Sequence, residues 1–214
     1  MAFNSVKELE ECLSKIITAN NPDLYDVNEF KVWKDLGERF TGDIWNDGKY
    51  IWKMHCHSQI IKDVNPKTVF ETGFNRGTSA CMFLNQLRKF NGEDSVKVYS
   101  NDINPRSLVN AEKLTAEFAN FEFVLGDSMV KLKPFLEEKK PELDYVFIDG
   151  AHSYDGAKSD TLAFQPYVKK GGVIVVDDWW IDGVRNGTLD AGWDGWEAFE
   201  VPKYERKALV FIKL

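Results

Sequence analysis

The sequence predicts an α/β fold: a Rossmann-like, doubly wound sheet that is mostly parallel, with a C-terminal antiparallel strand and an N-terminal helical cap. From Lys67 onward, short runs rich in β-branched and aromatic residues alternate with stretches of helical periodicity, as in parallel βαβ units. Residues 1–65 show helical periodicity without such runs. The segment from Trp196 to Leu214 has a break at Pro202 followed by an apolar run, which indicates a closing antiparallel pair.

Each expected strand has an apolar centre and is followed by turn residues. The strands are expected at 67–71, 96–101, 121–125, 143–148 and 172–176. The helices are expected at 78–90, 105–118, 128–138 and 155–168, long enough for right-handed crossovers between parallel strands. Ligands of such sheets bind outside the carboxyl ends of the strands, so residues directly after each strand are the candidates for a site.

The 214 residues fit one domain, with 1–65 as the helical cap region and 66–214 as the Rossmann-like core, because no repeat or linker divides them. Apolar residues make up 43% and charged residues 29%, and no apolar run nears the roughly 20 residues of a membrane span. The N-terminus lacks the apolar core of a signal peptide, so we expect a cytoplasmic protein without a membrane partner. Cys12, Cys56 and Cys81 lack metal-binding spacing and are expected to be reduced thiols.

The formal net charge of −7 disfavours nucleic acid as a partner, because binding to a polyanion draws on clustered Lys and Arg. A small molecule is the expected partner instead. The sequence leaves the formation of a homo-oligomer open.

The first informative motif places an acid and two glycines around the end of the first strand. Glu71 ends the strand, Gly73 lets the backbone pass close to a ligand, and Gly77 lets the next helix pack against the strand. The middle glycine that admits a pyrophosphate in dinucleotide-binding proteins is absent, and the bulky Phe74 and Arg76 occupy the loop. We therefore expect a ligand without a pyrophosphate; the alternative is a purely structural strand-to-helix turn.

Two further acids follow the second and third strands. Asp102 could accept hydrogen bonds from both hydroxyls of a ribose, and Asp127 could accept one from the exocyclic amine of an adenine. Each could instead be the N-cap of the helix that follows it.

Together these motifs resemble the class I S-adenosylmethionine methyltransferases over residues 67 to 178. The resemblance implies that S-adenosylmethionine is the cofactor and that Asp102 holds its ribose. It also implies that Asp127 and Ser128 hold the adenine. The residues that it places around the methionine end are Glu71, Gly73, Gly77 and Ser79.

Three further acids follow the fourth and fifth strands, namely Asp149, Asp177 and Asp178. If these strands are parallel neighbours, their carboxyl ends lie about 4.8 Å apart and the acids converge on one rim of the sheet. Carboxylates that lie so close repel one another, and a hard divalent cation relieves that repulsion. We therefore expect a metal site for Mg²⁺, with Mn²⁺ or Ca²⁺ as alternatives.

The segments that carry these acids look like those of the metal-dependent O-methyltransferases of the catechol and macrocin types and of the cephalosporin-hydroxylase-like group. The resemblance implies that Asp149, Asp177 and Asp178 are metal ligands. It places His152 where the catechol-type enzymes have a catalytic lysine. His152 could otherwise be a loop histidine bonded to backbone, and it could be a neighbour of the metal rather than a base. Asp155 could orient His152 or cap a helix that begins at Gly156.

His55 and His57 are two positions apart on an expected helix, so their side chains face different ways and cannot share a metal. We expect both to be ordinary helix residues near the cap.

These expectations describe an S-adenosylmethionine-dependent and divalent-metal-dependent O-methyltransferase that acts on a hydroxyl group of a small molecule. In the expected mechanism His152 takes the proton of the hydroxyl. The alternatives are a catechol-type O-methyltransferase, a nucleotide-binding Rossmann enzyme, and an inactive binding protein with the same fold.

A sugar or glycoside is the favoured acceptor because four tryptophans lie close in sequence to the expected metal ligands. Indole faces pack on sugar C–H surfaces, although each of these rings could instead close the core. The four are Trp179, Trp180, Trp193 and Trp196. Nearby side chains that could bond a polyhydroxylated ligand are Asp182, Arg185, Asn186 and Asp190.

Overall fold

The computed structural model describes residues 57–201 and 208–214, except 59, 63, 93 and 94. The expected helical cap at 1–65 therefore lies almost wholly outside the described residues, and so do Cys12, His55 and Cys56. The described residues between 57 and 64 are helical, as expected.

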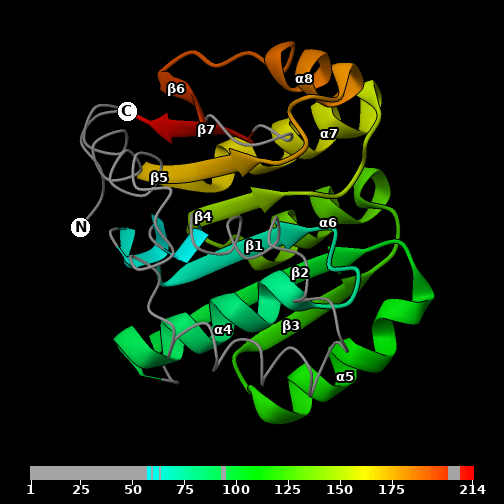
Figure 1. Ribbon diagram of the computed structural model, residues 1–214, viewed down its shortest axis with the longest axis vertical. Coiled ribbons are helices and arrows are strands. Elements are labelled where there is room, and N and C mark those ends of the chain that lie inside the picture. Colours follow the sequence, from blue (N-terminus) through cyan, green and yellow to red (C-terminus); the bar gives the residue numbers. More distant parts are fainter. Residues whose placement is uncertain (1–56, 59, 63, 93–94, 202–207) are drawn as a thin grey trace, which may run out of the picture.

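A seven-stranded sheet forms the centre of the molecule, in the order β3-β2-β1-β4-β5-β7-β6 (Figure 1). Its parallel strands are β1 (Thr68–Thr72), β2 (Lys97–Asp102), β3 (Phe121–Leu125), β4 (Leu143–Ile148) and β5 (Val168–Val176). Two antiparallel strands, β6 (Trp196–Val201) and β7 (Ala208–Lys213), complete it, with β7 beside β5. The predicted doubly wound sheet with an antiparallel C-terminal pair is confirmed.

Helices cover both faces of this sheet (Figure 1). They are α4 (Thr78–Asn91), α5 (Leu108–Glu117), α6 (Ser128–Lys139), α7 (Tyr154–Phe164) and α8 (Asp182–Leu189), with short 3-10 helices at Pro105–Ser107 and Gln165–Tyr167. Apolar residues of α4 and α5 join one core cluster, and those of α6, α7 and α8 join a second on the opposite face. Among the described helices, none is both long and apolar enough to cross a membrane.

Helix α8 was not expected from the sequence, because its two glycines make it a poor helix by propensity. The structure shows why they are there. A Cβ atom at Gly187 would lie 2.1 Å from the carbonyl oxygen of Tyr154, and one at Gly183 would lie 3.1 Å from the Tyr154 nitrogen. The glycines thus let α8 pack directly against the start of α7, and tertiary packing outweighs their weak propensity.

Two residues singled out in the sequence are buried in the structure. Cys81 is a buried free thiol on α4. His57 is buried, 4% exposed, and its Nδ1 lies 2.5 Å from the hydroxyl of Tyr145, so it is a core histidine.

Candidate active site

A pocket of about 430 Å³ opens at the carboxyl ends of the parallel strands, where the chain order predicts a ligand site. Turns that follow β1, β2, β3, β4 and β5 all contribute to its lining. The predicted site residues that line it are Gly73, Ser79, Asp102, Asp127, Ser128, Asp149, His152, Asp177 and Asp178. The pocket lining therefore joins the expected cofactor residues and the expected metal residues in one cavity.

Glu71 and Gly77 do not line this pocket. Glu71 is fully buried and accepts a hydrogen bond of 2.5 Å from the Ser100 hydroxyl. Gly77 has a φ of +86°, and a Cβ atom there would lie 2.4 Å from the ring of Phe74. Phe74 itself is buried against Phe123, with ring centroids 5.0 Å apart, so the bulky residue of the loop serves as its anchor in the core.

The loop after β1 adopts a glycine-like turn although its middle glycine is missing. Asn75 has a φ of +51°, a left-handed conformation that Asn tolerates better than most residues. Its backbone N–H donates to Oδ2 of Asp102. Gly73, at φ +83°, passes so close to β4 that a Cβ atom would lie 2.0 Å from the carbonyl oxygen of Asp149. Asn75 thus takes the place of the middle glycine found in glycine-rich dinucleotide-binding loops.

Asp102 ends β2 and is held in the pocket wall by backbone donors. Besides the N–H of Asn75, it accepts a bond of 2.7 Å from the N–H of Asn104. The N-cap of the following 3-10 helix is Asn104, whose side chain accepts from the N–H of Arg106 at 3.0 Å. Asp102 is therefore not the cap, and its carboxylate retains acceptor capacity for another donor.

Asp127 has the alternative role expected for it, that of a helix N-cap, and it lines the pocket as well. It is the N-cap of α6, and its side chain accepts from the N–H of Met129 at 3.0 Å. Ser128 begins the helix beside it. Sequence reasoning overlooked Asn101, whose Nδ2 donates to the carbonyls of Val124 and Gly126 and ties β2 to the turn after β3.

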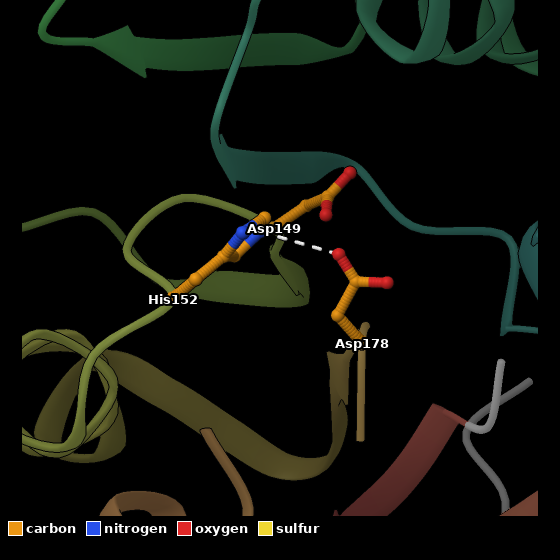
Figure 2. A group of neighbouring side chains, drawn as sticks. All are labelled: Asp149, His152 and Asp178. Atoms are coloured by element: carbon orange, nitrogen blue, oxygen red, sulfur yellow. Dashed lines mark ion pairs between the residues drawn. The ribbon is translucent and has the colours of Figure 1, made fainter. Parts of the chain in front are cut away.

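Asp149, His152 and Asp178 also line this pocket, and Figure 2 shows their side chains gathered together. Each offers one ligand atom, and these atoms all lie within 4.8 Å of one another. Nε2 of His152 lies 3.2 Å from Oδ2 of Asp178, the histidine being half exposed and the aspartate buried. The parallel pairing of β4 with β5 produces this convergence, because Ile148 and Val176 are in register directly before the acids.

Asp177 lines the same pocket and is 5% exposed, but it does not belong to this group of three. The chain turns between the two acids, because Asp178 adopts a left-handed φ of +50°. The structure therefore pairs Asp178 with Asp149 and adds His152, which sequence reasoning treated mainly as a base.

Asp155 is not the cap of a helix at Gly156, so that alternative is excluded. Helix α7 begins at Tyr154, and its N-cap is Ser153, whose side chain accepts from the N–H of Gly156 at 3.2 Å. Asp155 lies in the first turn of the helix. The carboxylate beside the imidazole of His152 is that of Asp178.

The four tryptophans do not gather beside the acids. Trp179 is buried in the second core cluster, and Trp193 and Trp196 pack on the same cluster with their rings perpendicular, 5.2 Å apart. Trp180 alone of the four contacts the acidic group: its Nε1 donates to Oδ1 of Asp178 at 3.0 Å, and the residue is 50% exposed. The core interpretation thus holds for three of the rings.

The polar residues expected to serve the acceptor lie on or after α8, outside the pocket lining. Arg185 pairs with Asp182 one turn away. Asp190 accepts a bond of 2.6 Å from the hydroxyl of Tyr154. These contacts stabilise α8 and its packing on α7.

Known O-methyltransferases are similar to this chain in sequence. The chain is 23% identical over 173 residues to rhamnosyl O-methyltransferases of Mycobacterium bovis and Mycobacterium tuberculosis, an alignment that covers 78% of this chain. It spans 63% of the length of those relatives.

Solved structures share the fold. An O-methyltransferase from Bacillus cereus, in complex with S-adenosylhomocysteine, superposes with a TM-score of 0.68 at 13% identity, covering 96% of this chain and 100% of that one. A TDP-rhamnose 3'-O-methyltransferase of calicheamicin biosynthesis gives 0.64 at 15% identity, covering 97% and 96%. These likenesses establish the Rossmann-like methyltransferase fold.

The sequence profile described as "Methyltransferase domain" matches residues 70–179, from β1 to the residue after the acid pair. The match spans more than half of the 214 residues and contains every turn that lines the pocket. It confirms the resemblance to class I S-adenosylmethionine methyltransferases, and the chain belongs to the methyltransferase domain family.

Proposed function

We propose that this protein is an S-adenosylmethionine-dependent O-methyltransferase that uses a divalent cation and methylates a hydroxyl group of a sugar or glycoside. One observation carries the proposal: a single pocket is lined both by the candidate cofactor residues, here called its cofactor end, and by the group Asp149, His152 and Asp178, here called its acidic end. A cofactor and a hydroxyl acceptor bound there would lie side by side.

The cofactor end suits a nucleoside without a pyrophosphate. Asp102 is held in place by two backbone donors and could accept from a ribose, while Asp127 and Ser128 stand at the start of α6 for the adenine. S-adenosylmethionine would supply an electrophilic methyl group on a sulfonium sulfur. The turn at Gly73 brings the chain against Asp149, so the cofactor residues and the acidic group share a wall.

The acidic end suits a divalent cation by the chemistry of its donors. The carboxylates of Asp149 and Asp178 offer oxygen atoms within 4.8 Å of each other, donors that suit Mg²⁺ or Mn²⁺, and carboxylates this close repel one another without a counter-charge. We assign Asp149 and Asp178 as ligands, with Asp177 in the same pocket lining. A cation held there would act as a Lewis acid that lowers the pKa of the acceptor hydroxyl.

His152 is the proposed proton acceptor. In its neutral form, an Nε2–H directed at Oδ2 of Asp178 leaves Nδ1 as the basic nitrogen. The carboxylate of Asp178 would stabilise the imidazolium that forms, as carboxylates do beside catalytic histidines. The half-exposed position of His152 at the pocket wall leaves it open to a substrate.

A sugar acceptor is supported by the relatives and by one side chain. The Mycobacterium relatives are rhamnosyl O-methyltransferases, and one structural neighbour is a TDP-rhamnose 3'-O-methyltransferase. Trp180 presents a half-exposed indole next to Asp178, where it could pack on the C–H face of a sugar ring.

The test is transfer of labelled methyl from S-adenosylmethionine to a panel of nucleotide sugars, free glycosides and catechols, with Mg²⁺ or with excess EDTA. We expect labelled sugar products, no turnover in EDTA, and S-adenosylhomocysteine binding that survives chelation. Labelling of catechols alone would overturn the sugar proposal, and full activity in EDTA would overturn the metal.

A further inference from the structure

A buried carboxylate lies beneath the pocket and takes no part in the proposed chemistry. Asp160, on α7, is 0% exposed. Burial raises the pKa of Asp160 to about 6, while the hydroxyls of Ser128 and Thr72 lower this pKa and the charge of Asp127 raises it. Within the described residues, neither oxygen of Asp160 has a well-aligned hydrogen bond, and neither does the hydroxyl of Thr72.

Asp160 lies against two turns that line the pocket, those after β3 and β4. A Cβ atom at Gly150 would lie 2.9 Å from Oγ1 of Thr72 and 3.4 Å from Oδ2 of Asp160, so the Gly150 backbone covers both side chains. Gly150 directly follows Asp149 in the turn after β4, and Ser128 opens α6 in the turn after β3. Polar groups from β1, α6 and α7 therefore meet directly below the site.

A buried carboxylate is costly unless donors satisfy it. Asp160 has two oxygens, and the two nearby hydroxyls can each rotate to donate one hydrogen bond. The two hydroxyls can therefore satisfy the two carboxylate oxygens, and an apolar residue at this position could not accept hydrogen bonds from them.

We propose that Asp160 is a positioning residue of the cofactor pocket: its carboxylate holds the hydroxyls of Thr72 and Ser128, which lie beside it, and so fixes the turn after β3 against the end of β1. This inference rests on the proposed function, because it takes the turn at Asp127 and Ser128 to hold the adenine. Through Ser128, Asp160 acts on the adenosine part of the ligand.

The experiment is calorimetric titration of S-adenosylhomocysteine and of adenosine into the full chain and its variants, with EDTA present. Asp160→Ala should weaken both ligands by the same factor, about tenfold. Asp160→Asn, with one acceptor oxygen in place of two, should lose about threefold. Asp155→Ala and Asp155→Asn change an exposed acid on the same helix and should bind as the unaltered chain does.

Thr72→Val keeps the shape and the carboxylate but removes one donor, and we expect it to weaken both ligands about threefold. This variant tests the proposal independently if Asp160→Ala fails to fold. Equal affinities in the unaltered chain, Asp160→Ala and Thr72→Val would overturn the proposal. A loss with S-adenosylhomocysteine that is absent with adenosine would do so too. If the unaltered chain binds neither ligand, the proposed function fails together with the inference, a result easily told from the other two.

Discussion

At the scale of single residues, the acidic side chains of this protein differ in their hydrogen-bond partners. Asp102 is fixed by two backbone N–H groups and faces the pocket, whereas Glu71 is fully buried with the Ser100 hydroxyl. Asp127 caps a helix and lines the pocket at once. Acidic residues therefore serve as ligand candidate, core residue or helix cap, and only the tertiary structure separates these roles.

Asp102→Ala should weaken S-adenosylhomocysteine binding by about 1–3 kcal/mol, because it leaves ribose hydroxyls unpaired. The variant also removes the acceptor for the N–H of Asn75, so the loop after β1 loses one of its ties. Calorimetry measures the loss, with Asp155→Ala as the control for removal of an exposed acid. An unchanged affinity would exclude Asp102 from the ribose site.

His152→Ala should lower kcat by roughly 10²- to 10⁴-fold while Mn²⁺ binding stays close to that of the unaltered protein. Asp149→Asn and Asp178→Asn should lower metal affinity, and Asp177→Asn should lower it less, since Asp177 stands outside the group of three. Metal titration by calorimetry and steady-state kinetics separate the two effects. A fall in metal affinity for His152→Ala as large as that for Asp178→Asn would make the histidine a ligand.

At the scale of elements, the site depends on turns that hold the chain in unusual conformations. Gly73 and Asn75 have left-handed φ in the loop after β1, and Asp178 has one after β5. These three positions bring the cofactor loop against β4 and separate Asp178 from Asp177.

Gly73→Ala should destabilise the protein and abolish S-adenosylhomocysteine binding, because the new methyl would lie 2.0 Å from the backbone of Asp149. Gly92→Ala is the matched control: its φ is +78°, but nothing lies within 4 Å of the added Cβ. The control should cost about 1–2 kcal/mol for the left-handed conformation alone. Urea unfolding compares the two variants, and equal losses would show that the close approach at Gly73 is not tight.

The helices and strands differ in how well the sequence predicts them. The five parallel strands could be predicted because apolar β-branched runs alternate with helical stretches, and the convergence of Asp149 with Asp178 followed from their place after neighbouring strands. Helix α8 could not, since its glycines serve contact with α7 rather than helix propensity. The contacts of Asp178 with His152 and Trp180 depend on its left-handed φ, which no periodicity reveals.

At the scale of the whole molecule, the negative charge gathers where the proposed ligands would bind. The pocket lining holds five aspartates against one arginine, Arg76, and one histidine. The five aspartates create an electrostatic field that favours cations, and the formal charge of the chain, −7, has the same sign. Both a sulfonium cofactor and a divalent cation match this field, whereas a dinucleotide would be repelled by it.

Asp160 should also make the stability of the whole fold depend on pH. Its pKa is about 6 in the folded protein and 3.8 in a model peptide, so the folded state binds the proton more tightly. The stabilisation from that proton is complete below about pH 3.8 and is lost as the pH rises through about 6. At neutral pH the buried charge lowers the free energy of unfolding by up to about 3 kcal/mol relative to the protonated acid.

Asp160→Asn replaces the carboxyl by a neutral group of the same shape, and the gain in stability over the unaltered chain should follow the titration of Asp160. The difference in free energy of unfolding should be smallest near pH 4, grow up to about pH 6 and stay level above it. Urea unfolding between pH 4 and 8 in EDTA measures it, with Asp155→Asn as the control for loss of an exposed acid on the same helix. A constant offset at all pH values would mean that Asp160 titrates near its ordinary pKa. If the rise appears while Asp160→Asn also binds S-adenosylhomocysteine less tightly, the carboxylate strengthens ligand binding and lowers the stability of the fold.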